Sequence, residues 1–139
     1  MLRVSFSRVY VFSASHRLHS ETLSDGENES VYDKCNNLHG HGHDYKLEVA
    51  VSGEPDQQTG MIIPMPELDE KVSKVLDRLD YKHLDKEVDY FKKIPSTGEN
   101  IILYLWNELV KEIGGSRLHH LKLWETNNNS FEIGKGGLQ

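Results

Sequence analysis

Cysteine is almost missing from this sequence: Cys35 carries the single thiol in 139 residues. One thiol excludes a framework of intramolecular disulfides and is typical of proteins in a reducing compartment. No apolar run approaches the roughly 20 residues that a transmembrane helix needs. Residues 1–10 alternate polar and apolar side chains and lack the apolar core of a signal peptide. We therefore expect a cytoplasmic protein.

Basic residues are outnumbered, because 16 Lys and Arg face 22 Asp and Glu, giving a formal net charge of −6. This balance argues against general nucleic-acid binding, which needs a basic face. It leaves room for a phosphorylated substrate, because a few local lysines or arginines can serve one pocket. The sequence has no internal repeat and no linker, so residues 1–139 are expected to form one domain.

Alternation of apolar and polar residues predicts four β-strands. The first covers residues 2–13, with a bulge between Phe6 and Val9, where the alternation changes phase. The others are expected at residues 45–52, 118–125 and 130–133. The polar segment 20–37 contains the turn-forming run Ser24-Asp25-Gly26 and is expected to be a loop.

Two helices are expected in the middle of the chain. Pro66 suits the first turn of one helix, whose apolar stripe runs from Leu68 to Leu79. Ser96-Thr97-Gly98-Glu99 has the spacing of a capping box and predicts the start of the other, which Gly114-Gly115 ends. The order ββααββ predicts an α+β fold, with a four-stranded antiparallel sheet and two helices on one face. Its long strands would leave exposed edges, so we expect an oligomer in which subunits pair into a closed barrel.

The motif His41-Gly42-His43 is the strongest chemical signal in the sequence. Side chains at i and i+2 of a strand share a face, so the two imidazoles can bind one ion. His16, at the end of an apolar run, can supply a third nitrogen. Three neutral imidazoles with an open fourth position are typical of catalytic zinc.

Three alternatives compete for the same residues. His39 lies two positions before His41 and is a rival third ligand. Cys35 is a rival fourth ligand, and its thiolate would make the site a closed structural one. A cupin site also combines His-x-His with a Glu, but Glu48 lies five positions after His43, which is an odd offset. That offset places Glu48 on the opposite face of a strand, and the helices disagree with an all-β jelly roll.

Three further groups have side chains suited to proton transfer or recognition. Cys35 lies in a polar loop, where a neighbouring cation or metal would lower its pKa and make it a proton acceptor. Asp80 and His83 follow the first helix and are either a solvated helix end or a proton relay for the cysteine. Glu125 ends an apolar strand, and its carboxylate suits the amino-pyrimidinone edge of a pterin or guanine.

These residues resemble the 6-pyruvoyl-tetrahydropterin synthase family, in order and nearly end to end. The match is carried by Phe12-Ser13-Ala14-Ser15-His16-Arg17-Leu18, Lys34-Cys35-Asn36-Asn37 and Gly40-His41-Gly42-His43-Asp44-Tyr45. It continues through Thr59-Gly60-Met61, Leu79-Asp80, Ser96-Thr97-Gly98-Glu99-Asn100 and Glu125-Thr126.

The resemblance implies the tunnelling fold, in which trimers with a central barrel stack as hexamers and active sites lie between subunits. It implies zinc-dependent conversion of 7,8-dihydroneopterin triphosphate to 6-pyruvoyl-tetrahydropterin, with loss of triphosphate, in tetrahydrobiopterin biosynthesis. By position, the metal ligands would be His16, His41 and His43. Cys35 would be the general base, assisted by Asp80 and a histidine. Glu125 would anchor the pterin, and Thr97 and Glu99 would help to bind the substrate.

Two departures from the family pattern stand out. The family usually has histidine directly after the Asp, but this sequence has Tyr81 there and His83 two residues later. Gly98 stands where animal enzymes usually have threonine. Two alternatives follow: the related 6-carboxy-tetrahydropterin synthase of queuosine biosynthesis, and a catalytically impaired homologue that binds zinc and pterin.

Overall fold

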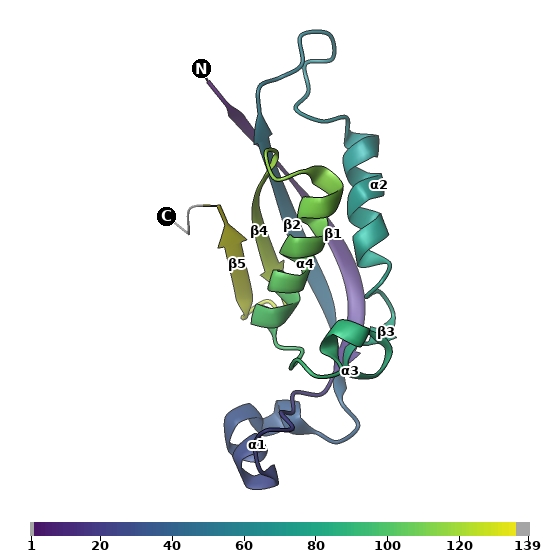
Figure 1. The fold of residues 1–139 in the computed structure, drawn as a ribbon, viewed down its shortest axis with the longest axis vertical. Coiled ribbons are helices and arrows are strands. Elements are labelled where there is room, and N and C mark those ends of the chain that lie inside the picture. Colours follow the sequence, from purple (N-terminus) through teal and green to yellow (C-terminus); the bar gives the residue numbers. More distant parts are fainter. Residues whose placement is uncertain (1, 136–139) are drawn as a thin grey trace.

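Two strands of 13 residues each, β1 (Val4–His16) and β2 (His41–Gly53), form the centre of the structure. They pair antiparallel along their whole length (Figure 1). Val4 lies opposite Gly53, and His16 lies opposite His41. The computed structural model describes residues 2–135. This long ladder places the end of β1 and the beginning of β2 side by side at one end of the sheet.

The prediction of a bulge in the first strand is wrong, because β1 pairs with β2 without interruption. Arg8 and Tyr10 take the inward positions where the pattern lacked apolar residues. Asp69 accepts a hydrogen bond from Arg8 Nε at 2.8 Å and one from the Tyr10 hydroxyl at 2.7 Å. The Asp69 carboxylate thus satisfies the polar groups of Arg8 and Tyr10. These two residues interrupt the alternation of apolar and polar residues in the sequence of β1. Val9 and Val11 face the other side of the sheet and are 51% and 74% exposed.

The sheet has five strands in the order β3-β1-β2-β4-β5 and is mixed, not the four-stranded antiparallel sheet that we expected. β4 (Leu118–Trp124) and β5 (Ser130–Gly134) are antiparallel to their neighbours and confirm the two predicted C-terminal strands. β3 (Lys82–His83) is parallel to β1 and was missed, because two residues give no periodic signal.

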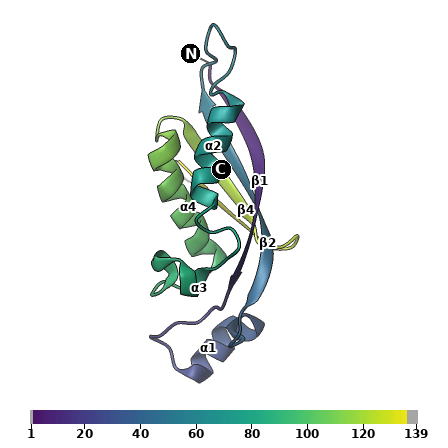
Figure 2. The ribbon, with the colours of Figure 1, turned by 90° about the vertical axis from the view of Figure 1, so that its right-hand side faces the viewer.

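Both predicted helices are present and lie on the same face of the sheet (Figure 2). α2 (Met65–Leu76) begins with Pro66 in its first turn, and α4 (Gly98–Ile113) ends at Gly114. Their apolar faces bury Leu68, Leu105 and their neighbours against Leu47 and Leu121 of the sheet. No helix within residues 2–135 is long and apolar enough to cross a lipid bilayer.

The segment that we expected to be a loop contains α1 (Asp25–Tyr32), followed by a 3₁₀ turn (Asp33–Asn36). Ser24 caps the helix: Glu27 N–H donates to its hydroxyl, and its own N–H donates to the Glu27 side chain. Fully buried Asn28 holds the segment together, because its side-chain amide donates to the carbonyls of Ser20 and Leu23. Few apolar residues are involved, so the sequence lacked the stripe that predicts a helix.

The start of α4 and the element before it also differ from the expectation. Thr97, not Ser96, is the N-cap residue, and its hydroxyl accepts the Asn100 N–H at 3.2 Å. The Ser96 hydroxyl instead donates to Asp85. Asp85 belongs to α3 (Leu84–Glu87), a single turn that the sequence did not predict. α3 therefore ties the start of α4 to the end of the sheet where β1 and β2 meet.

Candidate active site

Strand alternation gathers three histidines at this end of the sheet. His16 is the last residue of β1, and His41 is the first residue of β2 and its pairing partner. His43 follows two residues later and shares the face of His41. The ring centroids of the three histidines lie 4.7–5.2 Å apart. The structure thus brings together the three predicted ligands, which we call the triad.

The triad has the geometry of a metal site. Its potential ligand atoms all lie within 4.8 Å of one another, and the group includes neither Cys35 nor His39 among the residues that the structure describes. His16 Nε2 lies 3.1 Å from His41 Nε2. His16 Nδ1–H donates to the Ser96 carbonyl at 2.7 Å, which fixes the tautomer and leaves the Nε2 lone pair free.

Charge and hydrogen bonding also fit a divalent cation in the triad. Burial lowers the pKa of His16 and of His41 below the ordinary 6.5, which favours the neutral, ligating form. His43 Nε2 is buried without a hydrogen-bond partner in the described residues. A bound cation would satisfy such an atom, whereas an unpaired buried nitrogen is costly. The residues present therefore fit a metal with three imidazole ligands.

Glu125 and Cys35 lie near this end of the sheet. Glu125 directly follows β4, its side chain is 11% exposed, and its Oε2 lies 3.9 Å from His16 Nε2. Cys35 sits in the 3₁₀ turn after α1, and its carbonyl accepts the Leu18 N–H at 2.8 Å. Burial raises the pKa of the Cys35 thiol, and the charges of Glu125 and Asp33 raise it further. Without a metal, the thiol is therefore less acidic than an ordinary cysteine.

The predicted acid–base segment is arranged differently from the simple Asp–His pair. Asp80 accepts a hydrogen bond from the Ser13 N–H at 2.8 Å. The carboxylate near His83 is that of Asp85, whose Oδ2 lies 4.0 Å from His83 Nδ1. Asp85 also accepts hydrogen bonds from the Arg17 N–H and the Ser96 hydroxyl. Tyr81 is 85% exposed, with a positive φ of 59°.

Gly40 permits a close approach between the triad and His83. It adopts φ +76°, and a Cβ there would lie 2.8 Å from the His16 carbonyl oxygen and 3.0 Å from His83 Nε2. Both His83 nitrogens are buried without a hydrogen-bond partner among residues 2–135. His83 thus lies against the loop that enters β2, beside the triad, with both nitrogens available.

Our sequence reasoning missed two residues of this site. Tyr45 follows His43 on the same strand face, and its ring stacks on Phe12 at 4.9 Å. The Tyr45 side chain is fully buried, and its hydroxyl has no partner in the described residues. Its position two residues after His43 was the available signal. Asp85 lies in the same titratable segment as Asp80 and His83, but the sequence did not single it out, because its contacts with Ser96 and Arg17 depend on the tertiary fold.

The two remaining predicted residues lie at the start of α4. Thr97 is partly exposed and caps the helix, and Glu99 is exposed in its first turn. The capping box that we expected between Ser96 and Glu99 is therefore not formed, because Thr97 is the N-cap residue. The backbone just before them belongs to the site, because the Ser96 carbonyl accepts the hydrogen bond from His16.

Comparisons with known proteins agree with this geometry. Residues 5–135 match the family described as 6-pyruvoyl tetrahydropterin synthase. The 6-pyruvoyl tetrahydrobiopterin synthase of Drosophila melanogaster is 46% identical over 125 residues, which are 88% of this chain and 74% of the fly protein. The human protein of that name is 45% identical over 124 residues, covering 88% of this chain and 86% of its own. The structure of Caenorhabditis elegans 6-pyruvoyl tetrahydropterin synthase superposes with a TM-score of 0.93, at 42% identity over 98% of both chains. The chain therefore belongs to the 6-pyruvoyl tetrahydropterin synthase family.

Proposed function

We propose that this chain is a 6-pyruvoyl-tetrahydropterin synthase, a lyase of tetrahydrobiopterin biosynthesis. It converts 7,8-dihydroneopterin triphosphate to 6-pyruvoyl-tetrahydropterin and releases triphosphate. The observation that carries the proposal is the triad, whose ligand atoms lie within 4.8 Å of one another. The fly and human relatives, named for this activity at 46% and 45% identity, support the same reaction.

Zinc is the metal that we assign to the triad. Three imidazoles with an open fourth position are the ligand set of catalytic zinc. Bound there, zinc supplies Lewis acidity toward the hydroxyls of the substrate side chain. His16 is held in its ligating tautomer by the Ser96 carbonyl, 2.7 Å from its Nδ1. Neutral imidazoles add no negative charge, so the loaded site would remain cationic.

Cys35 is the proposed general base. Its pKa in the metal-free protein is raised, first by burial and then by Glu125 and Asp33. A cation held by the nearby triad would counteract the negative charges of Glu125 and Asp33, lower the pKa of Cys35 and so favour the thiolate. The thiolate then removes a proton from the substrate side chain and returns one to the pterin ring. Proton transfer is thus coupled to the loading of the metal site.

We propose that His83 and Asp85 assist this transfer, in place of an Asp80–histidine pair. His83 has two free nitrogens beside the triad, and Asp85 lies 4.0 Å from its Nδ1. Asp80 keeps a positioning role through its hydrogen bond to the β1 backbone at Ser13. Tyr81 is 85% exposed, and we assign it no part in the relay.

Substrate recognition is proposed for the loop after β4 and the start of α4. The Glu125 carboxylate, 11% exposed, can accept paired hydrogen bonds from the amino-pyrimidinone edge of the pterin. Thr97 and Glu99 are proposed to bind the same substrate. Glu125 lies 3.9 Å from His16, so the pterin it anchors would extend its side chain toward the triad.

We propose a hexamer of two stacked trimers, in which sheets of neighbouring subunits close a barrel. The helix-free face of the sheet exposes Val9 and Val11, and the end strands β3 and β5 each have one unpaired edge within the described residues. Such surfaces favour association. Native mass spectrometry of the purified protein tests the assembly, and a monomer at micromolar concentration would contradict it.

The activity is tested with purified, zinc-loaded protein and 7,8-dihydroneopterin triphosphate. We expect equimolar release of triphosphate and 6-pyruvoyl-tetrahydropterin, identified by mass spectrometry. A 6-carboxy product would favour the queuosine-pathway activity instead. Substrate binding without triphosphate release would identify an impaired homologue.

A further inference from the structure

A cavity of about 440 Å³ is lined by His83 and by Arg17 and His39, which neighbour the triad residues His16 and His41 in the sequence. Three segments enclose it: the chain after β1, the loop before β2, and α3 with the residues that follow it. Its lining includes Arg17, His19, His39, Lys86, Lys92 and Lys93. We call it the basic cavity. None of the proposed roles described above uses its lysines.

The basic cavity is cationic in a chain whose net charge is negative. Arg17 and the three lysines face only two carboxylates in the lining, Glu21 and Asp85. Asp85 already accepts hydrogen bonds from the Arg17 N–H and the Ser96 hydroxyl. Lys92 pairs with Asp89 at 2.8 Å, which leaves Arg17, Lys86 and Lys93 as the main positive charges. Concentrated positive charge in a hollow raises the local concentration of anions.

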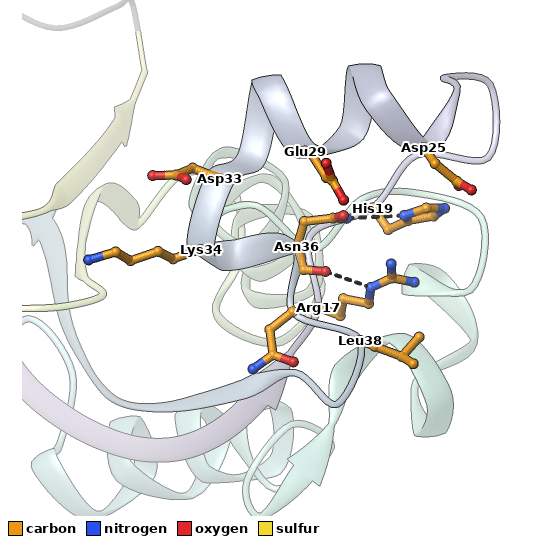
Figure 3. Close-up of a pocket in the computed structure, with 9 residues that line it drawn as sticks. Arg17, His19, Asp25, Glu29, Asp33, Lys34, Asn36 and Leu38 are labelled. Carbon is orange, nitrogen blue, oxygen red and sulfur yellow. Dashed lines mark hydrogen bonds between the residues drawn. The ribbon is translucent and has the colours of Figure 1, made fainter.

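A larger cavity of about 980 Å³ on the other side of Arg17 serves as an internal comparison (Figure 3). Asp25, Glu29 and Asp33 contribute to its lining beside Lys34. Arg17 belongs to both cavities, and its Nε donates to the Asn36 carbonyl at 3.1 Å (Figure 3). The three carboxylates make the larger cavity unfavourable for a polyanion. The larger cavity is therefore the less favourable anion site, despite its size.

His83 connects the basic cavity to the proposed reaction centre. Its ring contributes to the wall of the cavity, and both of its nitrogens lack partners in the described residues. Position 40 requires glycine, because any Cβ there would clash with the His16 carbonyl oxygen and crowd His83 Nε2. An anion in the basic cavity would thus lie against the imidazole that faces Gly40, beside the His16 backbone.

We propose that the basic cavity binds a chain of phosphates, the triphosphate group of the substrate, and holds it while it leaves. This inference rests on the proposed function. Arg17 presents a planar fork that matches phosphate oxygens, and Lys86 and Lys93 add point charges. A leaving group held there has its negative charge stabilised as the bond to the substrate carbon breaks.

Isothermal titration with inorganic tripolyphosphate, the probe, tests the cavity without requiring turnover. The double variant Lys86→Gln/Lys93→Gln is expected to weaken tripolyphosphate binding about tenfold or more in the zinc-loaded protein. Lys74→Gln is the matched control, because Lys74 is 63% exposed on α2 and pairs with Glu112. The control should bind within about twofold of the unchanged protein. Binding should also weaken as ionic strength rises.

Two further readouts separate this inference from the proposed function. Binding of neopterin, which lacks phosphates, should be unchanged in the double variant. If that variant binds tripolyphosphate as tightly as the Lys74→Gln protein, the cavity assignment is wrong, even if the synthase activity is present. If the double variant shows the loss but no synthase activity is found, the anion site stands and the proposed reaction fails.

Discussion

His16 and His41 are pairing partners at the end of the β1–β2 ladder, and their Nε2 atoms lie 3.1 Å apart. Either the His41 ring donates its Nε2–H to His16, or both rings present lone pairs to a cation that would lie between them. The ladder thus fixes the metal site through backbone pairing, before any contact with substrate.

Replacing His41 with alanine is expected to abolish stoichiometric metal binding. Removing one of three protein ligands leaves two, too few to retain zinc against a chelator. Zinc content is measured by plasma mass spectrometry after dialysis against a weak chelator. His39→Ala is the control, because His39 lies outside the triad but only two residues away. Equal zinc in both variants would refute the ligand assignment.

The Cys35 thiol in the metal-free protein is expected to react with iodoacetamide only at higher pH than an ordinary cysteine. Burial, then Glu125 and Asp33, raise its pKa, and the thiolate is the reactive form. Glu125→Gln removes one of the two negative charges and should shift the rate profile to lower pH. Zinc loading should shift it in the same direction. A profile unchanged in the Glu125 variant would show that Glu125 does not contribute, which leaves burial and Asp33 as the causes.

The metal-free protein is expected to lose stability as the pH falls below about 6.5. The folded-state pKa values of His16 and His41 are lowered, chiefly by burial, so the unfolded chain binds more protons between the two values. Their contribution is fully present above the unfolded pKa and is lost as the pH falls through the folded one. Urea midpoints at about pH 7.5 and pH 5.5 measure the effect. His16→Asn should shrink the difference, and an equal difference in both proteins counts against His16.

His83→Ala is expected to lower kcat by about 10²–10⁴-fold, the usual contribution of a positioned acid or base. Tyr81→Phe should have little effect, because Tyr81 is 85% exposed and has no part in the proposed relay. The pH dependence of kcat is the second readout. His83→Gln retains a hydrogen-bonding side chain and should keep substrate binding while losing the relay. A large loss in the Tyr81 variant with none in His83→Ala would reverse the assignment.

The sequence predicted the triad better than the groups around it. His41 and His43 share a face because side chains alternate between the two faces of a strand. His16 joins them because β1 and β2 pair along their whole length. Both rules are local or nearly so. Asp85 and Ser96 gained their places from tertiary contacts between α3, α4 and the sheet, which leave no spacing in the sequence. Tyr45 could have been found from its position two residues after His43 on the same strand face. α1 was missed because Asn28 and the Ser24 cap, rather than an apolar stripe, hold it in place.

Gly98, the second departure from the family pattern, has a partner in β5. A Cβ at Gly98 would lie 2.0–2.5 Å from three ring atoms of Phe131. The Phe131 ring therefore fills the space that a side chain at position 98 would need. Gly98→Thr forces the ring to move and is expected to lower the free energy of unfolding by about 1–3 kcal/mol.

A double-mutant cycle tests this pairing. Phe131→Val alone loses ring contacts at a partly buried position and should be moderately destabilising. In combination with Gly98→Thr, it makes room for the threonine. The double variant should therefore lose less unfolding free energy than the two single variants lose together. Urea denaturation of the four metal-free proteins gives the coupling free energy. Strict additivity would mean that the cost of Gly98→Thr does not come from Phe131, and the glycine would then need another explanation.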